Sequence, residues 1–457
     1  MKTSTLISLI LSSLLFSAIS SAETTPTETD AGTTTSQNEA SLPVAPPQPL
    51  PLPLNDLRKF SDIFGKIKQD YVEEIDDTTL LNYAIRGMLS GLDPHSAYLE
   101  PSAFTDLREN TSGTFGGLGI EVGMENGFVK VIAPIDDTPA QKGGVEAGDL
   151  IIQLDDSPVK GLSLNQAVEK MRGEIGTPIV LTIVRAGERE PLKLTLTRDV
   201  IQVTSVKTVE LGDSYGYIRI TQFQAQTGSD FEKGLNTLKD NMASLTGLII
   251  DLRNNPGGVL KASVNVADQL IEEGLIVYTE GRAKVAQLSF SATPGDSTNG
   301  MPIIVLIDGG SASASEILAG ALQDHDRAVI MGTQSFGKGS VQNVLSLGED
   351  YGLKITTARY FTPNGRSIQA QGITPDIEVN RAKLSDEKQR KTFREADLTG
   401  HLSNNTLDAS NENENENEDE DVDTEEARKR AMLEKDFQLQ EALNLLKAID
   451  ILKIGKS

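Results

Sequence analysis

The spacing of apolar positions changes along the chain, and each spacing is typical of a different kind of element. Between residues 57 and 109 apolar side chains recur every three or four positions, which predicts helices. From residue 113 to about residue 199 short apolar runs alternate with glycine and aspartate turns, which predicts short strands with one helix at residues 164–171. From about residue 201 onward strand-like and helix-like segments take turns. The pattern therefore predicts a multidomain α/β protein.

The last of these regions contains apolar runs with the length of buried strands. Residues 247–252 and 302–308 are mostly apolar, and a glycine pair follows each of them. Further strands are expected at residues 214–222 and 328–331, with a helix at residues 231–242. This alternation of strands and helices predicts an α/β core.

The N-terminal residues have the composition of a targeting segment. Lys2 is followed by an apolar run at residues 6–19 that ends in small residues at Ala22, which is typical of a secretory signal peptide. A membrane anchor is the alternative, but the run is short and interrupted by serines. Residues 23–54 are rich in threonine and proline, so we expect an extended linker there.

The C-terminal residues differ from a compact domain. Residues 411–426 contain ten acidic residues and four asparagines, a composition that predicts no packed structure. An amphipathic helix is expected beyond them, because Leu433, Phe437, Leu443 and Ile449 recur at helical spacing. This helix could dock on the body of the protein or pair between subunits.

Charge and residue usage narrow the class of function. The chain has 66 acidic and 42 basic residues and no broad basic stretch, so we expect no nucleic-acid partner. It has no cysteine, which excludes disulfides, thiolate metal sites and a cysteine nucleophile. The three histidines, His95, His325 and His401, are scattered, so we expect neither a metal nor a cofactor, and we interpret His95 as structural. Export without cysteine suits a bacterial periplasm.

Most of the candidate chemistry lies between residues 302 and 342. Ser313 follows a glycine pair and opens a predicted helix, where unpaired backbone N–H groups and the positive end of the helix dipole meet. Such groups can stabilise the oxyanion of an acyl-transfer intermediate. Lys338 lies in a glycine-rich loop and can act as the base if burial lowers its pKa.

The same residues allow two other interpretations. Ser313 and Glu316 match a capping box, in which the serine caps the helix and has no catalytic task. The run from Gly332 to Lys338 is close to a phosphate-binding loop. That loop needs Ser or Thr after the lysine and then a helix. Here Gly339 follows, and the apolar residues beyond it lie on an irregular run, so we reject the nucleotide site.

The two motifs together resemble one known family. GSASASEILAGALQDHDRA, starting at residue 310, and GTQSFGKGSVQ, starting at residue 332, resemble the carboxy-terminal processing (tail-specific) proteases, which use a serine–lysine dyad. The resemblance implies Ser313 as nucleophile, Lys338 as base and Gln342 as the residue that orients the lysine. Asp308 departs from the pattern, because many members have asparagine there. The resemblance extends from residue 57 to about residue 379.

Residues 113–199 resemble a PDZ domain in the order of their glycine loop, GDLI run and helix. Successive N–H groups of such a loop can hold a carboxylate while a peptide adds as a strand. The resemblance implies that the substrate's C-terminus binds at Gly117, Leu118, Gly119 and Ile120.

Two further assignments depend on the resemblance. DLRNNPGG at residues 251–258 is similar to a family motif, and a glycine pair lets backbone N–H groups approach a substrate closely. The resemblance therefore implies the amides of Gly258 and Ala314 as oxyanion donors. Arg172 ends the predicted PDZ helix, where an ordinary solvated arginine is favoured by the dipole. The family resemblance implies instead that Arg172 relays PDZ occupancy to the active site.

The expected fold class is α/β (α+β multidomain), with a helical N-terminal domain, a PDZ domain, a mixed-sheet serine protease core and a C-terminal helix. The expected segments are a signal peptide at 1–22, a linker at 23–54, the helical domain at 55–112, the PDZ domain at 113–199, the protease core at 200–383, a linker with the acidic run at 384–426 and the C-terminal helix at 427–457.

The expected function is that of an exported serine endopeptidase that trims proteins near their C-termini. Its expected partners are protein or peptide substrates with apolar C-termini and further copies of the chain, in a dimer or larger homo-oligomer. A periplasmic adaptor protein and an association with the membrane stay open. The alternative from another class is a PDZ-bearing scaffold with an inactive protease core, and intact Ser313 and Lys338 argue against it.

Overall fold

The structure, a computed structural model, describes residues 53–135, 137–212, 214–348, 350–382 and 436–454. The expected signal peptide, nearly all of the first linker and the acidic run lie outside these residues. The chain divides into two compact units, Met1–Glu74 and Ile75–Ser457. In the described part of the chain, no helix has the length and apolarity that crossing a membrane requires.

The described part of the first unit contains one helix, α1 (Leu54–Asp70). Its apolar positions recur at helical spacing, as predicted, but none of its residues is buried. Phe60 and Ile63 are among the exposed apolar side chains. The helix has acidic Asp56 in its first turn and basic Lys68 in its last turn, which suits the helix dipole.

The second unit begins with α2 (Asp77–Ser90), β1 (Ala97–Leu99) and α3 (Pro101–Ser112). The side chain of Asp76 caps α2 by accepting a hydrogen bond from the Thr79 N–H, at 2.9 Å. Strand β1 pairs antiparallel with β18 (Tyr351–Phe361), so the helical region adds a strand to a sheet of the core. Exposed apolar side chains of α2 include Leu81, Tyr83 and Met88.

The expected PDZ domain is built on an antiparallel sheet of order β3-β4-β5-β7-β8, with β6 beside β5. Helix α5 is capped by a capping box of Ser163 and Gln166. Strands β2 and β9 pair at the point where the chain enters and leaves the domain. The elements are β2 (Thr114–Gly117), β3 (Ile120–Glu125), β4 (Phe128–Pro134), α4 (Pro139–Lys142), β5 (Leu150–Leu154), β6 (Ser157–Pro158), α5 (Leu164–Met171), β7 (Pro178–Val184), β8 (Leu192–Thr197) and β9 (Asp199–Gln202).

The main core sheet has the order β10-β11-β12-β15-β16-β19. It is mixed, as expected, because β10 and β11 are antiparallel and the remaining neighbours are parallel. Its elements and connecting helices are β10 (Val206–Leu211), β11 (Tyr215–Ile220), α6 (Thr227–Asn241), β12 (Gly247–Asp251), α7 (Leu260–Asp268), β15 (Ile303–Ile307), α8 (Ala314–Asp324), β16 (Val329–Gly332) and β19 (Ile377–Glu378).

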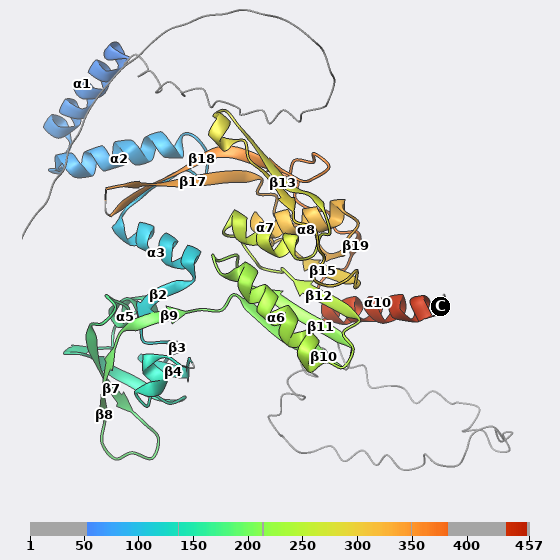
Figure 1. Ribbon diagram of the computed structural model, residues 1–457. Helices are drawn as coiled ribbons and strands as arrows, with labels where there is room; N and C mark the ends of the chain where they lie inside the picture. Colours follow the sequence, from blue (N-terminus) through green and yellow to red (C-terminus); the bar gives the residue numbers. More distant parts are fainter. Residues whose placement is uncertain (1–52, 136, 213, 349, 383–435, 455–457) are drawn as a thin grey trace, which may run out of the picture. The chain divides into compact units, whose positions relative to one another are not determined.

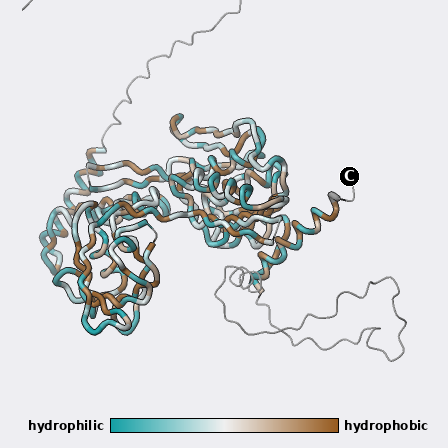
Figure 2. Tube along the Cα trace, turned by 60° about the horizontal axis from the view of Figure 1, so that its bottom comes forward, coloured by the Kyte–Doolittle hydropathy of each residue, from teal (hydrophilic) through white to brown (hydrophobic). Residues whose placement is uncertain are grey.

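Side chains alternate between the two faces of this sheet. Because both faces are covered, β12 and β15 are buried throughout. Ile250 and Val305 pack on the face covered by α6, α7 and α8. Ile249 and Ile304 point to the other face, where they pack against α10 (Phe437–Ile454). Hydrophobic positions recur along α10 in Figure 2. The C-terminal helix therefore docks on the body of its own chain.

A second sheet has the order β1-β18-β13-β14, with β17 beside β18. Its further strands are β13 (Gly274–Gly281), β14 (Ser289–Ala292) and β17 (Ser340–Leu347), and a short helix, η1, lies at Lys284–Ala286. Strand β17 corrects one expectation, because the run after Gly339 forms a paired strand, with one register shift between Val341 and Gln342. It pairs with β18, and the spacing of apolar residues could not predict that β1 and β13 are further partners of β18.

Candidate active site

Ser313 lies at the turn between β15 and α8, directly before the first helical residue. Its backbone has φ 56° and ψ −111°, a left-handed conformation that is strained for a residue other than glycine. The turn is fixed by its neighbours. The Ser311 hydroxyl donates to the Leu252 carbonyl at 2.8 Å, and the Ser315 hydroxyl donates to the Asn255 carbonyl at 2.9 Å. Strain of this kind persists only where the surroundings determine the backbone, and it is typical of functional sites.

The carboxylate of Glu316, in the first turn of α8, joins the two candidate catalytic residues. Glu316 is fully buried. Its Oε2 accepts hydrogen bonds from the backbone N–H of Ser313 at 2.7 Å and of Lys338 at 2.9 Å. Its Oε1 accepts from the N–H of Gly337 and the hydroxyl of Ser335, both at 2.6 Å. One carboxylate thus fixes the serine turn relative to the lysine loop.

The hydrogen bonds of Glu316 also include the contact expected of the predicted capping box. The Ser313 N–H does donate to Glu316, as a capping box requires. The carboxylate, however, receives three more hydrogen bonds from the loop 335–338, which is distant in sequence. Capping and a catalytic arrangement are therefore not alternatives at this position.

Lys338 is partly buried, and its surroundings favour the neutral amine. Burial lowers the pKa of Lys338, and the positive charge of Lys354 on β18 lowers it further, while the negative charge of Glu316 opposes both effects. Within the described residues no carboxylate forms an ion pair with the Lys338 amine. An amine with a lowered pKa can accept a proton from a serine hydroxyl.

A turn of the helical region, Asp93 to Ser96, also belongs to this neighbourhood. The positive charge of Lys338, after the larger effect of burial, lowers the pKa of His95, so the two side chains lie near each other. Asp93 accepts a hydrogen bond from the Thr356 hydroxyl at 3.1 Å. We interpreted His95 as structural from the sequence, and its position near Lys338 was not predicted. Asp93 before proline, with Ser96 three residues on, is a turn signal, but the nearness of His95 in this turn to Lys338 depends on the pairing of β1 with β18.

Gln342 lies on β17 and connects to the same turn. Its amide nitrogen donates to the hydroxyls of Ser340, at 3.0 Å, and Thr356, at 3.2 Å. Within the described residues no hydrogen bond joins Gln342 to Lys338. The role of Gln342 in orienting the lysine therefore stays a prediction.

The glycine pair after β12 approaches the serine turn closely. Gly257 has φ 96°, and a Cβ there would lie 2.8 Å from the Cβ of Ser313 and 2.9 Å from the amide nitrogen of Ala314. Gly258 has φ 139°, and a Cβ there would lie 2.1 Å from the carbonyl oxygen of Phe223. Only glycine fits both positions. In the described part of the chain, the N–H groups of Gly258 and Ala314 donate no hydrogen bond, so both are available for an oxyanion.

Tyr360 on β18 lies beside Ser313 and Glu316, and its side chain is fully buried. Burial, together with the negative charge of Glu316, raises the pKa of Tyr360 well above its ordinary value. Among the described residues the hydroxyl has no hydrogen-bond partner of normal geometry. A tyrosine hydroxyl with a raised pKa is a poor acceptor for the proton of the Ser313 hydroxyl.

The four predicted carboxylate-binding residues line one cavity of about 160 Å³ in the expected PDZ domain. The loop requires glycine at Gly119, which has φ 76° and where a Cβ would lie 2.3 Å from the Cβ of Thr138. Val168 and Met171 of α5 also line the cavity and contribute apolar side chains to it. Strand β3 beside it is the edge strand of its sheet and can accept a further strand.

Arg172 lies at one end of this cavity and is more than a solvated side chain. Its Nη1 lies 2.8 Å from Oε2 of Glu109 on α3, and its guanidinium lies 4.6 Å from the ring centroid of Phe115. Its Nε is buried and, within the described residues, has no hydrogen-bond partner. The side chain thus connects the PDZ helix to the helical region before the domain.

In the described part of the chain, no group of three or more His, Asp or Glu residues could hold a metal ion.

Comparison with known proteins gives three matches along the chain. Residues 214–379 match peptidase family S41, residues 116–196 match a PDZ domain, and residues 10–103 match the N-terminal domain of the activating protease CtpB. The matched ranges fall on the mixed-sheet core, the antiparallel domain and the N-terminal region, which confirms the expected fold class.

Curated relatives match over most of their own length. A carboxy-terminal-processing protease of Bartonella bacilliformis is 50% identical over 349 residues, which is 76% of this chain and 80% of the relative. A carboxyl-terminal-processing protease of Synechocystis is 38% identical over 66% of this chain and 71% of the relative. The carboxy-terminal processing protease CtpB of Bacillus subtilis is 35% identical over 71% of this chain and 68% of the relative.

The charge of Lys354 provides a test of the electrostatics around Lys338. The rate at which a fluorophosphonate labels Ser313 should rise with pH, with a midpoint below 10.5, the ordinary pKa of lysine, because only the neutral amine accepts the proton. Lys354→Met removes a positive charge that lowers this pKa, so the midpoint should move to higher pH. The measurement is the labelling rate as a function of pH.

Two controls make this result specific. Lys354→Arg keeps the charge and should keep the midpoint. His95→Asn removes a further nearby group that titrates and should leave the shift caused by Lys354→Met intact. A midpoint in Lys354→Met that stays at the wild-type pH or moves lower would contradict the proposed electrostatics.

Proposed function

Because the chain belongs to the carboxy-terminal processing proteases of peptidase family S41, we propose that it hydrolyses its substrates through a Ser313–Lys338 dyad. It is a serine-type peptidase with a PDZ domain. The observation that carries the proposal is the buried Glu316 carboxylate, which accepts a hydrogen bond from the backbone N–H of both residues of the dyad. The lowered pKa of Lys338 supports it.

The proposed reaction follows from these groups. The Ser313 hydroxyl attacks the scissile carbonyl carbon while the neutral Lys338 amine takes the hydroxyl proton. The carbonyl oxygen becomes an oxyanion that the N–H groups of Gly258 and Ala314 stabilise. Lys338 then gives its proton to the leaving amine, the peptide C–N bond breaks, and an acyl enzyme remains. A water molecule loses a proton to Lys338 and attacks the ester carbonyl. The ester C–O bond then breaks, Lys338 returns the proton to the Ser313 oxygen, and the acid is released.

Gln342 can take part in this scheme only through one of its atoms. Its amide nitrogen already donates to Ser340 and Thr356. We therefore propose that its amide oxygen accepts a hydrogen bond from the Lys338 amine during the reaction. This would orient the lone pair of the lysine toward Ser313.

Mutation of the dyad tests the mechanism. Ser313→Ala and Lys338→Ala should each remove nearly all hydrolysis of a peptide substrate, and the double variant should be little worse, because the two residues act as one unit. The measurement is kcat/KM for the three variants. Lys207→Ala, on the exposed side of β10, is the matched lysine control and should retain normal activity.

Near-normal kcat in Lys338→Ala would rule out the dyad. Covalent labelling of Ser313 in the unmodified protein also distinguishes the enzyme from a PDZ-bearing scaffold with an inactive core, which would not react.

We further propose that the substrate's C-terminus binds in the PDZ cavity. Its carboxylate would accept hydrogen bonds from the loop at residues 117–120, its backbone would pair with the free edge of β3, and its last apolar side chain would pack on Val168 and Met171. Arg172 would report this occupancy, because it lines the cavity and binds Glu109 outside the domain. A lysine could not reproduce the contacts of Arg172 with Glu109 and with the ring of Phe115, since it lacks the planar guanidinium.

The relay predicts a difference between binding and turnover. A substrate with a free apolar C-terminus should be cut faster than the same peptide amidated. Arg172→Ala should lower kcat while leaving the Kd of a C-terminal peptide nearly unchanged, because the peptide's own contacts remain. Kinetics and peptide titration measure the two quantities, with Lys170→Ala on the same helix as the control. An equal loss of affinity and turnover would make Arg172 a substrate contact instead.

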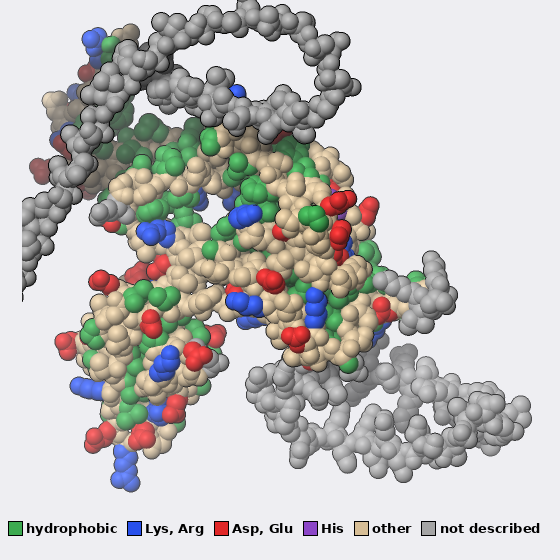
Figure 3. Space-filling model, in the orientation of Figure 1, with side chains coloured by type: hydrophobic (Ala, Val, Ile, Leu, Met, Phe, Trp, Pro, Cys, Tyr) green, Lys and Arg blue, Asp and Glu red, His purple; other side chains and the backbone are tan. Residues whose placement is uncertain are grey.

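Export and self-association complete the proposal. The composition of residues 1–22 supports secretion to a bacterial periplasm. Exposed apolar side chains on α2 and on the β17–β18 hairpin, visible in Figure 3, support a homo-oligomer. Cell fractionation and the mass of the purified protein in solution test these points. An unprocessed cytoplasmic monomer would contradict both.

A further inference from the structure

The loop between β12 and α7 carries the glycine pair, and contacts of three preceding residues position it. The Asn254 N–H donates to the Asp308 carboxylate at 2.8 Å. The Asn255 side chain donates to the Ile220 carbonyl at 2.8 Å, and its own carbonyl accepts from the Ala312 N–H at 2.9 Å. These two anchors come from the sheet and from the turn before Ser313. The anchor of Arg253 comes from a different part of the chain.

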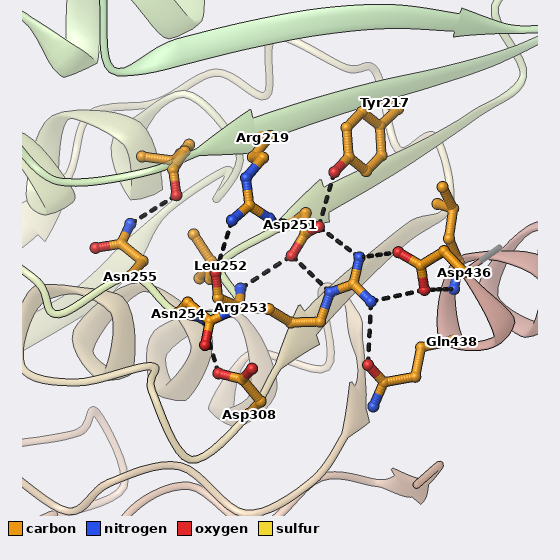
Figure 4. Close-up of polar contacts among 12 residues, drawn as sticks. Tyr217, Arg219, Asp251, Leu252, Arg253, Asn254, Asn255, Asp308, Asp436 and Gln438 are labelled. Atoms are coloured by element: carbon orange, nitrogen blue, oxygen red, sulfur yellow. Dashed lines mark hydrogen bonds and ion pairs between the residues drawn. The ribbon is translucent and has the colours of Figure 1, made fainter. Parts of the chain in front are cut away.

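Arg253 is held between two carboxylates, as Figure 4 shows. Its Nε and Nη2 contact Asp251 at 2.9 and 2.6 Å, and its Nη1 and Nη2 contact Asp436 at 2.8 and 2.7 Å. Its Nη1 also lies 3.0 Å from the side-chain oxygen of Gln438. The guanidinium is buried, and its second carboxylate partner belongs to the residue directly before α10. Paired contacts of this kind fix the orientation of a guanidinium as well as its place.

The cluster contains equal numbers of positive and negative side chains, and its buried carboxylate, Asp251, accepts several hydrogen bonds. Asp251 is buried and also accepts hydrogen bonds from the Tyr217 hydroxyl, at 2.7 Å, and from Arg219, at 2.9 Å. Arg219 donates in turn to the Arg253 carbonyl. Two arginines and two aspartates therefore face one another at the C-terminal edge of β12. Loss of either aspartate would leave an arginine partly unpaired in a buried place.

Helix α10 also docks on the core sheet through contacts outside this cluster. Leu439, Leu443 and Leu446 are buried against the core sheet. At the far end of the helix Asp450 accepts hydrogen bonds from the Tyr215 hydroxyl, at 2.8 Å, and the Thr246 hydroxyl, at 2.7 Å. Apolar packing and this second anchor hold the helix on the sheet. The contact of Asp436 with Arg253 is thus available to set the geometry of the loop.

We propose that Asp436 and Gln438 are positioning residues of the oxyanion hole. By fixing Arg253 at the start of the loop, they hold Gly257 and Gly258 at the distance from Ser313 that lets the Gly258 N–H bind the oxyanion. The C-terminal helix thereby completes the catalytic site of its own chain. This inference rests on the proposed Ser313–Lys338 mechanism.

Asp436→Asn is the sharpest test, because it changes the charge and keeps the helix start. The carboxylate of Asp436 also caps α10, accepting the Leu439 N–H at 3.1 Å, and asparagine caps helices equally well. The variant should lower kcat about tenfold or more, with KM nearly unchanged. Complete loss of one oxyanion donor costs roughly 100- to 1,000-fold, so the effect should stay below that range. Affinity for a peptide boronate, which mimics the tetrahedral intermediate, should fall in the same proportion.

Asp450→Asn is the matched control, since it alters the same residue type on the same helix, away from the loop. It should keep normal kcat and boronate affinity. Gln438→Ala removes a neutral partner of Arg253 and should show a smaller loss in the same direction as Asp436→Asn. This second variant covers the case in which Asp436→Asn lowers the melting temperature more than the control does.

The outcomes separate this inference from the proposed function. Normal kcat and boronate affinity in both Asp436→Asn and Gln438→Ala, while Ser313→Ala is inactive, would overturn the positioning role alone. Equal losses in Asp436→Asn and Asp450→Asn would also overturn it, because the effect would then belong to helix docking. Activity that survives in Ser313→Ala would instead overturn the proposed function.

Discussion

The buried carboxylate of Glu316 is the interaction on which the rest of the site depends. Placing an ionised carboxylate in a protein interior is costly unless hydrogen bonds replace its water shell. Here four donors do so, and three of them are backbone N–H groups, of Ser313, Gly337 and Lys338. Backbone donors fix the path of the chain as well as the side chain. The serine turn and the lysine loop are therefore held as one unit, although a helix and a strand separate them in sequence.

The same arrangement explains how a lysine beside a glutamate can act as a base. The negative charge of Glu316 alone would favour the protonated amine, but its hydrogen bonds go to backbone and hydroxyl donors. Burial and the charge of Lys354 then prevail, and the pKa of Lys338 is lowered. The oxyanion side is built on the same principle. Gly257 and Gly258 bring backbone close to Ser313, and their loop is anchored by Arg253, Asn254 and Asn255.

Many strands, helices and glycine motifs could be predicted from the sequence, because each of them depends on residues that are close together in the chain. The apolar runs at 247–252 and 302–308 became β12 and β15, and the helix after Ser313 became α8. The glycine pair and the PDZ loop were assigned from their resemblance to known motifs, in which glycine lets the backbone approach a ligand closely. What could not be predicted depends on contacts between distant segments. Glu316 matched a cap, and nothing local showed that its carboxylate reaches residues 335–338. His95 looked structural because its place beside Lys338 follows from the pairing of β1 with β18. The destination of α10 was open, since an amphipathic stripe does not say which surface covers it.

The most direct measurement is the rate at which a fluorophosphonate labels Ser313 in Glu316→Gln. Glutamine nearly preserves the volume, but it replaces one acceptor oxygen by a donor that faces N–H groups, so at least one of the two anchored segments must move. The account predicts labelling slower by about a hundredfold or more in a folded protein, consistent with the typical cost of disturbing such a site. Ser335→Ala is the control, because it removes one donor to the same carboxylate and keeps the contacts of Ser313 and Lys338. Wild-type labelling in a folded Glu316→Gln variant would contradict the account.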